Sequence, residues 1–326
     1  MQDIYKREIN YLRVSVTDRC NLRCVYCMPA QGVKPIAHRE ILRLEEIETV
    51  ARAAAGVGIR RIRLTGGDPL VRKGLEELVR RLAGIPGLDD LSLTTNGLLL
   101  SSRARVLREA GLQRVNISLD TLDAGRFRII TRGGDLSAVR AGIQAALEAG
   151  LSPVKLNTVL IRGFNDDEAV AMARLTMTKR LHVRFIELMP IGSSSEWTKD
   201  RLVPAWETMR RIENKLGQLL PVRDYQGGGP ARYYRIKDAA GTVGFISAMS
   251  EHFCHTCNRL RLTPAGGLRP CLFDGREVDL RSPLRDGAGL TEIAALIRGA
   301  VALKPGRHGE GGGWQEGWRE MSQIGG

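Results

Sequence analysis

The sequence lacks any long apolar run: no stretch of its 326 residues reaches the roughly eighteen consecutive apolar side chains of a membrane-spanning helix. We therefore expect no membrane partner. The first ten residues have no apolar core or cleavage site of the kind that a secretory signal carries, so a cytoplasmic location is expected. Aromatic residues are also scarce, at 5%, which argues against a surface that binds nucleic acid by base stacking.

Positive charge is abundant but not concentrated in one place. The formal net charge is +13, and 40 of the 49 basic residues are arginine. This balance favours a polyanionic partner, such as nucleic acid, an anionic lipid or a phosphorylated small molecule. Because the sequence contains no run of five or six consecutive basic residues, most of the arginines are expected to form an ordinary solvated surface.

Six cysteines fall into two groups of three. The first trio is Cys20, Cys24 and Cys27, and the second trio is Cys254, Cys257 and Cys271. Tight spacing in a chain without a secretory signal favours metal binding or redox chemistry over disulfides. Cysteines only three or four positions apart are also poorly placed to pair with each other. We therefore expect both trios to hold metal.

Short β-rich runs alternate with amphipathic stretches over the first two-thirds of the chain. The expected strands are 11–16, 59–64, 91–95, 115–119, 154–160 and 183–188. The expected helices are 44–56, 74–82, 102–110, 138–150 and 167–177, where apolar residues recur at three- and four-residue spacing. Six β–α units in series predict an α/β fold with a parallel sheet, open or curled toward a barrel.

The composition changes after about residue 221. A glycine-rich turn at 226–230 precedes two predicted strands, 232–237 and 243–246, which read as a hairpin. This part of the chain carries the second trio. We therefore predict two domains, residues 1–220 and residues 221–326, and a mobile glycine-rich stretch at 306–314.

The first trio follows the first predicted strand, where the β–α loops of such folds build active sites. Three thiolates can bind three irons of a cubane cluster and leave the fourth iron open for a ligand, whereas an electron-transfer cluster normally takes four cysteines. A zinc site completed by His38 is the alternative. The spacing C-x3-C-x2-C suits tetrahedral zinc poorly.

The C-x3-C-x2-C spacing, with Tyr26 before the last cysteine, resembles the signature of the radical S-adenosylmethionine superfamily. The resemblance implies that the open iron chelates the methionine amino and carboxylate groups, and that reductive cleavage gives a 5′-deoxyadenosyl radical. Gly66-Gly67-Asp68-Pro69 resembles the family's G-G-E-P loop, with Asp68 in place of the usual glutamate. The residues implied to contact S-adenosylmethionine are Tyr26, Gly66, Gly67, Asp68, Ser118 and Met189.

The second trio, C-x2-C-x13-C, also leaves one ligand position open. Taken alone, this segment equally allows a zinc ribbon completed by His252 or His255, since C-x2-C knuckles are typical of zinc sites. Together with the first trio, with residues 17–24, 130–133 and 257–261, and with the terminal Gly325-Gly326, it resembles the GTP 3′,8-cyclase family, which begins molybdenum cofactor biosynthesis. The resemblance implies a second [4Fe–4S] cluster whose open iron binds the guanine base.

Basic residues on the expected strands suit a triphosphate, whose oxygens arginine binds bidentately. Lys155 and Arg184 occupy strand positions that are usually apolar in a parallel sheet, and a buried charge without a partner is costly, so an anionic ligand is expected there. The implied GTP site comprises Arg13, Arg61, Arg63, Thr94, Lys155, Arg184, Arg259, Leu260 and Arg261. Catalytic roles are implied for Arg13, Arg259, Arg261, Gly325 and Gly326, the last two on a tail that reaches back into the active site.

The resemblance implies an incomplete (β/α)6 TIM-like barrel whose mouth is capped by a C-terminal iron–sulfur domain. It implies a lyase that converts GTP to (8S)-3′,8-cyclo-7,8-dihydroguanosine 5′-triphosphate, with two [4Fe–4S] clusters and S-adenosylmethionine as cofactors. The expected partners are GTP, a low-potential electron donor, the next enzyme of the pathway (cyclic pyranopterin monophosphate synthase) and a second copy of the chain, but no nucleic acid.

Two alternatives stay open at this point. A radical enzyme that modifies peptides would also carry an auxiliary cluster, although such enzymes typically bring more cysteines to that domain. A zinc- or cluster-containing protein that binds nucleic acid would suit the net charge and the C-x2-C spacing.

Overall fold

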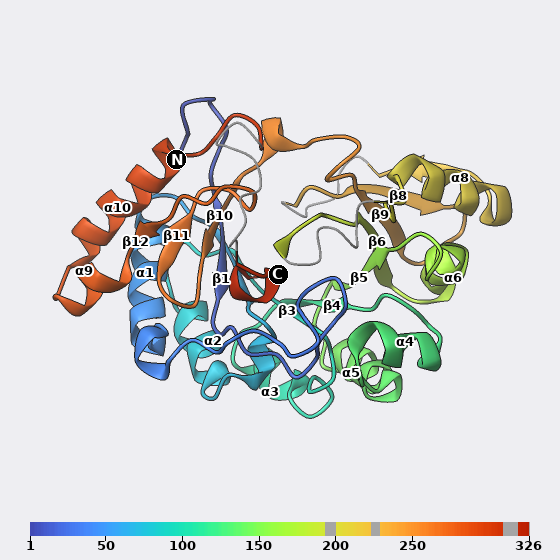
Figure 1. The fold of residues 1–326 in the computed structure, drawn as a ribbon, viewed down its shortest axis with the longest axis horizontal. Coiled ribbons are helices and arrows are strands. Elements are labelled where there is room, and N and C mark those ends of the chain that lie inside the picture. The colour runs from blue at the N-terminus through green and yellow to red at the C-terminus, as the bar shows by residue number, and fades with distance from the viewer. Residues whose placement is uncertain (193–199, 223–228, 309–318, 326) are drawn as a thin grey trace.

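The computed structural model describes residues 1–192, 200–222, 229–308 and 319–325. The described strands form one twelve-stranded sheet with the order β12-β11-β10-β1-β2-β3-β4-β5-β6-β9-β8-β7 (Figure 1). Strands β1 to β6 follow one another in the chain and in the sheet, and each is parallel to the next. This series confirms the predicted α/β class and the partial barrel.

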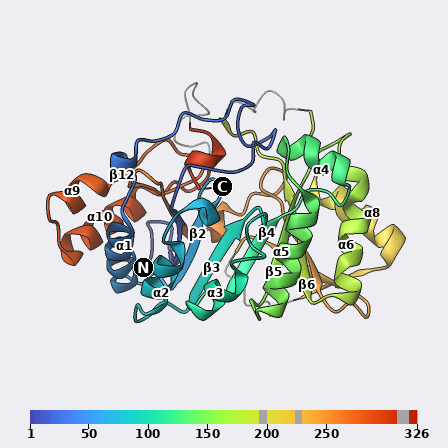
Figure 2. The ribbon, with the colours of Figure 1, turned by 90° about the horizontal axis from the view of Figure 1, so that it is seen from below.

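The elements of the barrel agree with the predicted ranges to within two residues for most strands and helices. The strands are β1 (Tyr11–Ser15), β2 (Arg61–Thr65), β3 (Asp90–Thr95), β4 (Arg114–Ser118), β5 (Val154–Leu160) and β6 (Leu181–Glu187). The helices are α1 (Leu44–Gly56), α2 (Leu75–Ala83), α3 (Ala104–Glu109), α4 (Ala124–Thr131), α5 (Leu136–Glu148) and α6 (Ala169–Thr178), which lie outside the sheet (Figure 2). Helix α4 was not predicted.

The C-terminal third extends both edges of this sheet. It contains α8 (Ala205–Leu216), β7 (Leu219–Pro221), β8 (Arg232–Ile236), β9 (Thr242–Ile246), β10 (Arg259–Leu262), β11 (Gly267–Arg269), β12 (Val278–Asp279), α9 (Arg281–Arg285) and α10 (Leu290–Ala302). Strand β9 pairs in parallel with β6, and β10 pairs in parallel with β1. The predicted hairpin is confirmed as the antiparallel pair β8–β9, whereas the domain boundary at 220/221 stays a prediction.

The two faces of the barrel strands differ in chemistry because side chains alternate across a strand. On β1, Leu12 and Val14 are buried in the main apolar core, as Ile62 and Leu64 are on β2. Arg13 lies between Leu12 and Val14 and therefore points to the opposite face. The apolar face packs against the helices, and the polar face lines the interior of the barrel.

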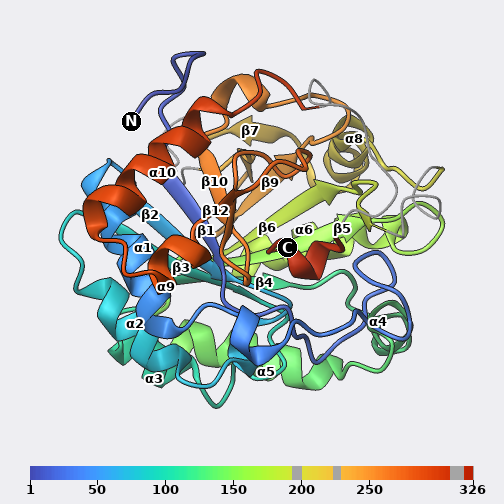
Figure 3. The ribbon, with the colours of Figure 1, turned by 60° about the vertical axis from the view of Figure 1, so that its left-hand side comes forward.

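The C-terminal tail enters this interior. Its short turn, Met321–Gln323, lies at the centre of the ring of strands (Figure 3). Ser322 and Ile324 are buried. In the described part of the chain, no helix combines the length and the apolar character that crossing a membrane requires.

Candidate active site

The loop between β1 and α1 carries the first trio, and the end of α4 holds it in place. The backbone N–H groups of Arg23 and Val25 donate to the carbonyls of Thr131 (3.1 Å) and Ile130 (2.9 Å). The Arg132 guanidinium donates to the carbonyls of Arg23 (3.0 Å) and Met28 (2.9 Å). The segment 130–133, noted only for its family resemblance, therefore anchors the cysteine loop.

The thiols of the first trio resist ionisation in the protein alone. Burial raises the pKa of Cys24 well above its usual value, and the neighbouring Cys27 adds to the effect. Burial also raises the pKa of Cys27, to about 12, together with the nearby Cys20. A bound metal removes thiol protons outright and supplies the opposing charge. The trio therefore fits a group that brings positive charge.

The placement of the possible ligand side chains bears on the zinc alternatives. Among the described residues, no three His, Cys, Asp or Glu side chains converge closely enough to hold one metal ion. Three cysteines that each bind a different iron of a cubane need not converge in this way. The mononuclear zinc alternatives, with His38 for the first trio and with His252 or His255 for the second, gain no support from this geometry.

Tyr26, inside the first trio, is fixed by a buried carboxylate. Its hydroxyl donates to Asp120 Oδ2 at 2.7 Å, and Asp120 Oδ1 accepts from the Val159 backbone at 2.8 Å. Burial raises the pKa of Asp120 to about 6, against the effect of these hydrogen bonds. The aromatic ring is thereby held over the cysteine loop.

The loop after β2 needs its glycines because it packs on the backbone that leads to Cys20. A Cβ on Gly66 would lie 2.6 Å from the Thr17 carbonyl oxygen, and one on Gly67 would lie 2.3 Å from the Arg19 carbonyl oxygen. The Gly67 N–H donates to Thr17 O at 2.9 Å. These contacts place the loop against the first trio.

Asp68 is fully engaged within the protein. Its carboxylate accepts hydrogen bonds from Leu70 N (2.9 Å), Thr95 Oγ1 (2.7 Å) and Asn96 N (2.7 Å). The side chain is 1% exposed. Asp68 thus ties the loop after β2 to the end of β3, and any contact with S-adenosylmethionine through its carboxylate stays a prediction.

Basic side chains stand in register across the barrel interior. Arg13 on β1 pairs with Arg261 on β10 and with Arg63 on β2. Arg63 Nε donates to Ser92 Oγ (3.3 Å), and Arg184 donates to Asn116 Oδ1 (2.6 Å), so an uncharged group accepts each of these hydrogen bonds. Side chains that were predicted to bind GTP, and that come from distant segments of the sequence, therefore lie on one surface.

This surface carries excess positive charge. Burial, followed by Arg184, Arg114 and Arg63, lowers the pKa of Lys155 to about 5. Burial and Arg259 lower the pKa of Arg261 to about 9. The buried polar atoms that lack a hydrogen-bond partner within the described residues include Thr94 Oγ1, Asn157 Oδ1 and Arg184 Nε. A polyanionic ligand with hydrogen-bonding groups would balance the positive charge and would also provide partners for these polar atoms.

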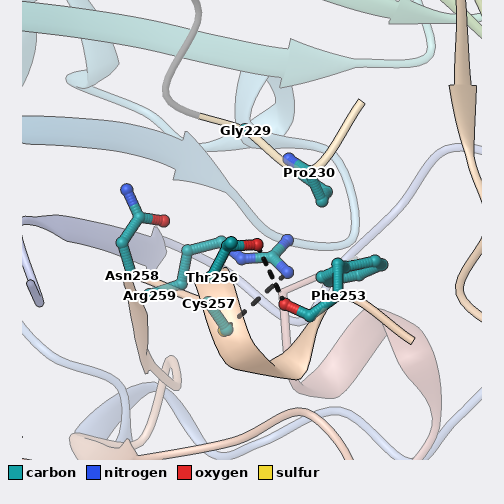
Figure 4. A pocket seen from close by; sticks show the side chains of 7 residues that line it. All are labelled: Gly229, Pro230, Phe253, Thr256, Cys257, Asn258 and Arg259. Atoms are coloured by element: carbon teal, nitrogen blue, oxygen red, sulfur yellow. Dashed lines mark hydrogen bonds between the residues drawn. The ribbon is translucent and has the colours of Figure 1, made fainter. Parts of the chain in front are cut away.

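Cys257 of the second trio lines a small cavity of about 200 Å³. Phe253, Cys257 and Arg259 line it together with Gly229, Pro230, Thr256 and Asn258 (Figure 4). The Arg259 guanidinium lies over the Phe253 ring, 5.1 Å from its centre, and 4.0 Å from Cys257 Sγ. Burial opposes ionisation of Cys257, but Arg259 and Lys304 outweigh it and lower its pKa to about 6. The charges of Arg259 and Lys304 therefore favour the thiolate form of Cys257.

The tail joins the two parts of the site. The Gly325 carbonyl accepts from Arg13 (3.0 Å) and Arg261 (3.3 Å). At its other end, the Ser322 backbone hydrogen-bonds Cys27. The tail therefore touches both the first trio and two of the arginines predicted to bind GTP.

The other predicted residues vary in position. Ser118 ends β4, and Met189 follows β6. Arg61 lies two residues before Arg63 on β2, at the end of the strand away from the Gly66–Gly67 loop. Leu260 is fully buried in the apolar core, so any contact with a ligand in the interior would use its backbone. Gly326 lies outside the described residues.

Two residues of the site were not predicted from the sequence. Asn96 Nδ2 lies 3.7 Å from Cys20 Sγ and donates to Asn21 Oδ1 at 2.7 Å. Glu187, at the end of β6, accepts from the backbone N–H groups of Met249 and Ser250, both at 2.8 Å. Glu187 thereby ties the barrel to the segment that leads to the second trio. The sequence signals were their places at strand ends: Asn96 directly follows β3, and Glu187 is the last residue of β6.

Comparisons with known proteins agree with this geometry. Residues 14–176 match the Radical SAM superfamily, and residues 181–310 match Molybdenum Cofactor Synthesis C. The GTP 3′,8-cyclase of Pelotomaculum thermopropionicum is 71% identical over 326 residues, covering 100% of both chains. The chain belongs to the GTP 3′,8-cyclase family. A further GTP 3′,8-cyclase, from Moorella thermoacetica, is 57% identical over 100% of both chains.

Family membership confirms the predicted resemblance and the predicted enzyme class. As a radical SAM enzyme of the GTP 3′,8-cyclase family, the chain binds a [4Fe–4S] cluster and S-adenosylmethionine. The nucleic-acid-binding alternative is not supported.

Solved structures of lower similarity bear on the fold alone. Streptococcus suis SuiB bound to S-adenosylmethionine has a TM-score of 0.59 at 14% identity, covering 88% of this chain and 68% of that chain. SuiB bound to its precursor peptide SuiA has the same TM-score at 15% identity, covering 82% and 60%. The shared barrel gives no support to a peptide substrate for this member of the GTP 3′,8-cyclase family.

Proposed function

We propose that the chain converts GTP to (8S)-3′,8-cyclo-7,8-dihydroguanosine 5′-triphosphate, the first step of molybdenum cofactor biosynthesis. The observation that carries the proposal is the polar interior face of the barrel, where Arg13, Arg63 and Arg261 stand in register on neighbouring strands and the last two are buried. Cys20, Cys24 and Cys27 would hold the first cluster, and S-adenosylmethionine bound there would supply the radical chemistry at the ribose 3′ carbon. The family names of the full-length relatives support the same assignment.

The barrel cations bind the triphosphate in this proposal. Lys155 is 1% exposed and Arg184 is 3% exposed, so neither can be stabilised by bulk water. Arg13, Arg63 and Arg261 extend the same charged surface across three neighbouring strands. Phosphate oxygens match arginine donors bidentately, and this fixes the ribose between the two trios.

The second trio holds a second [4Fe–4S] cluster that binds the guanine base. Cys257 lines the small cavity, beside the Phe253 ring and the Arg259 guanidinium. A planar base fits a cavity bounded by an aromatic ring and a guanidinium plane. With the base held there and the triphosphate held by the barrel cations, the ribose lies between them with its 3′ carbon directed toward the first trio.

Binding of GTP is expected to take up a proton at Lys155. With a pKa of about 5, the free amine is mostly neutral at pH 7, and an adjacent phosphate would raise that pKa. GTP binding is therefore expected to take up a proton from solvent at any pH between about 5, the pKa of Lys155 in the free protein, and the ordinary pKa of a lysine. Calorimetry in buffers of different ionisation enthalpy should show a buffer-dependent binding enthalpy.

Lys155→Met should remove most of that dependence and weaken GTP binding by roughly 30-fold or more, since losing one partner of a buried charge pair costs about 2–5 kcal/mol. Lys179→Met, at an exposed position after α6, serves as the matched control and should change neither quantity. An unchanged buffer dependence in Lys155→Met would remove this lysine from the triphosphate site.

Transfer of deuterium tests the reaction itself. Reconstituted protein would be incubated without oxygen with S-adenosylmethionine, a strong reductant and GTP deuterated at the ribose 3′ carbon. Mass spectrometry of 5′-deoxyadenosine should find deuterium in that product. Formation of unlabelled 5′-deoxyadenosine would contradict abstraction of the ribose 3′-hydrogen of GTP. Absence of any 5′-deoxyadenosine from protein with its full iron content would contradict the proposal as a whole.

The remaining partners belong to the same proposal. The reaction needs a low-potential electron donor and delivers its product to cyclic pyranopterin monophosphate synthase. A cytoplasmic homodimer is the proposed form of the enzyme.

A further inference from the structure

The segment that follows α10 is built onto the second trio. Arg7 is 7% exposed, and its Nε pairs with Asp3 Oδ2 at 2.6 Å. The same guanidinium donates to the carbonyls of Cys254 (2.8 Å), Pro305 (2.7 Å) and Gly306 (3.2 Å). One buried cation thus fastens the backbone of a cysteine to the backbone of residues 305–306.

Lys304 fastens the other two cysteines of the trio. It is 2% exposed, and its Nζ donates to the carbonyls of Arg259 (2.9 Å) and Pro270 (2.7 Å). Pro270 directly precedes Cys271, and Arg259 follows Cys257 by two residues. Residues 304–308, which we call the clamp segment, are therefore tied to all three cysteine-bearing stretches.

His308 ends the clamp segment against a cysteine. Its Nδ1 lies 3.4 Å from Cys254 Sγ. The imidazole stacks on Phe273, with ring centres 4.6 Å apart and planes at 24°. His252 meets it edge-on, with ring centres 4.1 Å apart. Two neighbouring rings thus fix the direction of Nδ1.

The chemistry of the contact decides which atom carries the proton. A metal-bound thiolate has no proton to give and can only accept a hydrogen bond. Nδ1 must therefore be the donor, which makes the neutral tautomer carry its proton on the nitrogen that faces sulfur. Hydrogen bonds to the ligand sulfurs are among the factors that set the reduction potential of an iron–sulfur cluster.

We propose that His308 is a positioning residue of the second cluster, which hydrogen-bonds the Cys254 thiolate and makes that cluster easier to reduce. The proposal rests on the second cluster of the proposed function. The donor withdraws negative charge from the sulfur, so it stabilises the reduced cluster, which carries one more electron, over the oxidised one. The clamp segment holds the donor in place.

The test isolates the second cluster. In a chain with Cys20, Cys24 and Cys27 all replaced by alanine, the remaining iron is counted and its reduction is followed by EPR at set potentials. His308→Ala should lower the ratio of reduced to oxidised cluster up to about tenfold at the parental midpoint, equivalent to about 59 mV for one electron. His308→Asn, whose Nδ2 takes the place of Nδ1, should restore most of the ratio. His255→Ala, an exposed neighbour of Cys254, should leave it unchanged.

A second measurement covers the case in which His308→Ala fails to hold iron. Pulsed EPR of the reduced cluster with ¹⁵N-labelled histidine should detect one weakly coupled nitrogen, and His308→Asn should lose it. Two outcomes would overturn the role of His308 without affecting the second cluster. One is a His308→Ala variant with full iron content and an unchanged midpoint potential, and the other is a reduced cluster with no coupled nitrogen. Absence of iron, or zinc in its place, in the parental background would overturn the second cluster itself, and this inference with it.

Discussion

Cys24→Ala is expected to abolish the cleavage of S-adenosylmethionine, whereas Cys257→Ala is expected to keep uncoupled cleavage and to lose the cyclised product. Cys24 lies in the first trio, where its carbonyl accepts from the Cys27 backbone N–H at 2.9 Å. Cys257 lines the cavity next to Phe253. The two variants therefore remove different ligand sets, and 5′-deoxyadenosine and cyclised product are measured in the same reaction.

Iron content provides the control for this pair. Each variant should keep about half of the iron of the unmodified protein, because the other trio is intact. Equal loss of both products in Cys257→Ala, with the first cluster still present by EPR, would contradict the division of work between the trios.

Gly325→Ala is expected to lower the turnover number by roughly 100-fold, since a displacement of about 1 Å near the reacting groups has effects of this size. The residue has φ +83°, and a Cβ there would lie 2.8 Å from Thr65 Oγ1 and 3.2 Å from Ser15 Cβ. The tail would have to move, and its carbonyl would leave Arg13 and Arg261. Turnover is measured with saturating GTP and S-adenosylmethionine.

Gly163→Ala separates this clash from backbone strain. Its φ is +72°, yet nothing lies within 4 Å of the added Cβ. Both variants therefore carry a similar left-handed strain, but only Gly325→Ala disturbs the interior. Matching losses of activity in the two variants would show that the tail needs no close fit.

The parallel strands were predictable because each has a strongly apolar face, and because amphipathic helical stretches separate them along the chain. Leu12 and Val14 on β1, or Leu91 and Leu93 on β3, face the helices and signal a buried strand. Lys155 and Arg184 broke that pattern, and both lie in the charged interior. The anion site was therefore partly readable from cations in places where a packed sheet has apolar residues.

Long-range pairing was not predictable. Arg259–Leu262 shows alternation, but nothing local indicates that Arg261 would stand beside Arg13 on β1. Helix α4 was missed because its apolar residues are not confined to one face: Phe127 is buried, whereas Ile129 is 61% exposed. His308 was missed because its glycine-rich surroundings predicted mobility, whereas Arg7 and Lys304 fix the preceding residues through distant carbonyls.

The pairing of β10 with β1 and of β9 with β6 has a consequence for the nascent chain during translation. During synthesis the six barrel strands emerge first, and both outer strands then present unpaired backbone edges, which invite association with other chains. These edges close only when the last third leaves the ribosome. The arginines of β10 and the C-terminal tail are synthesised in that same last third. A truncated chain that lacks it would therefore contain the first trio but not the arginines and the tail that complete the barrel interior.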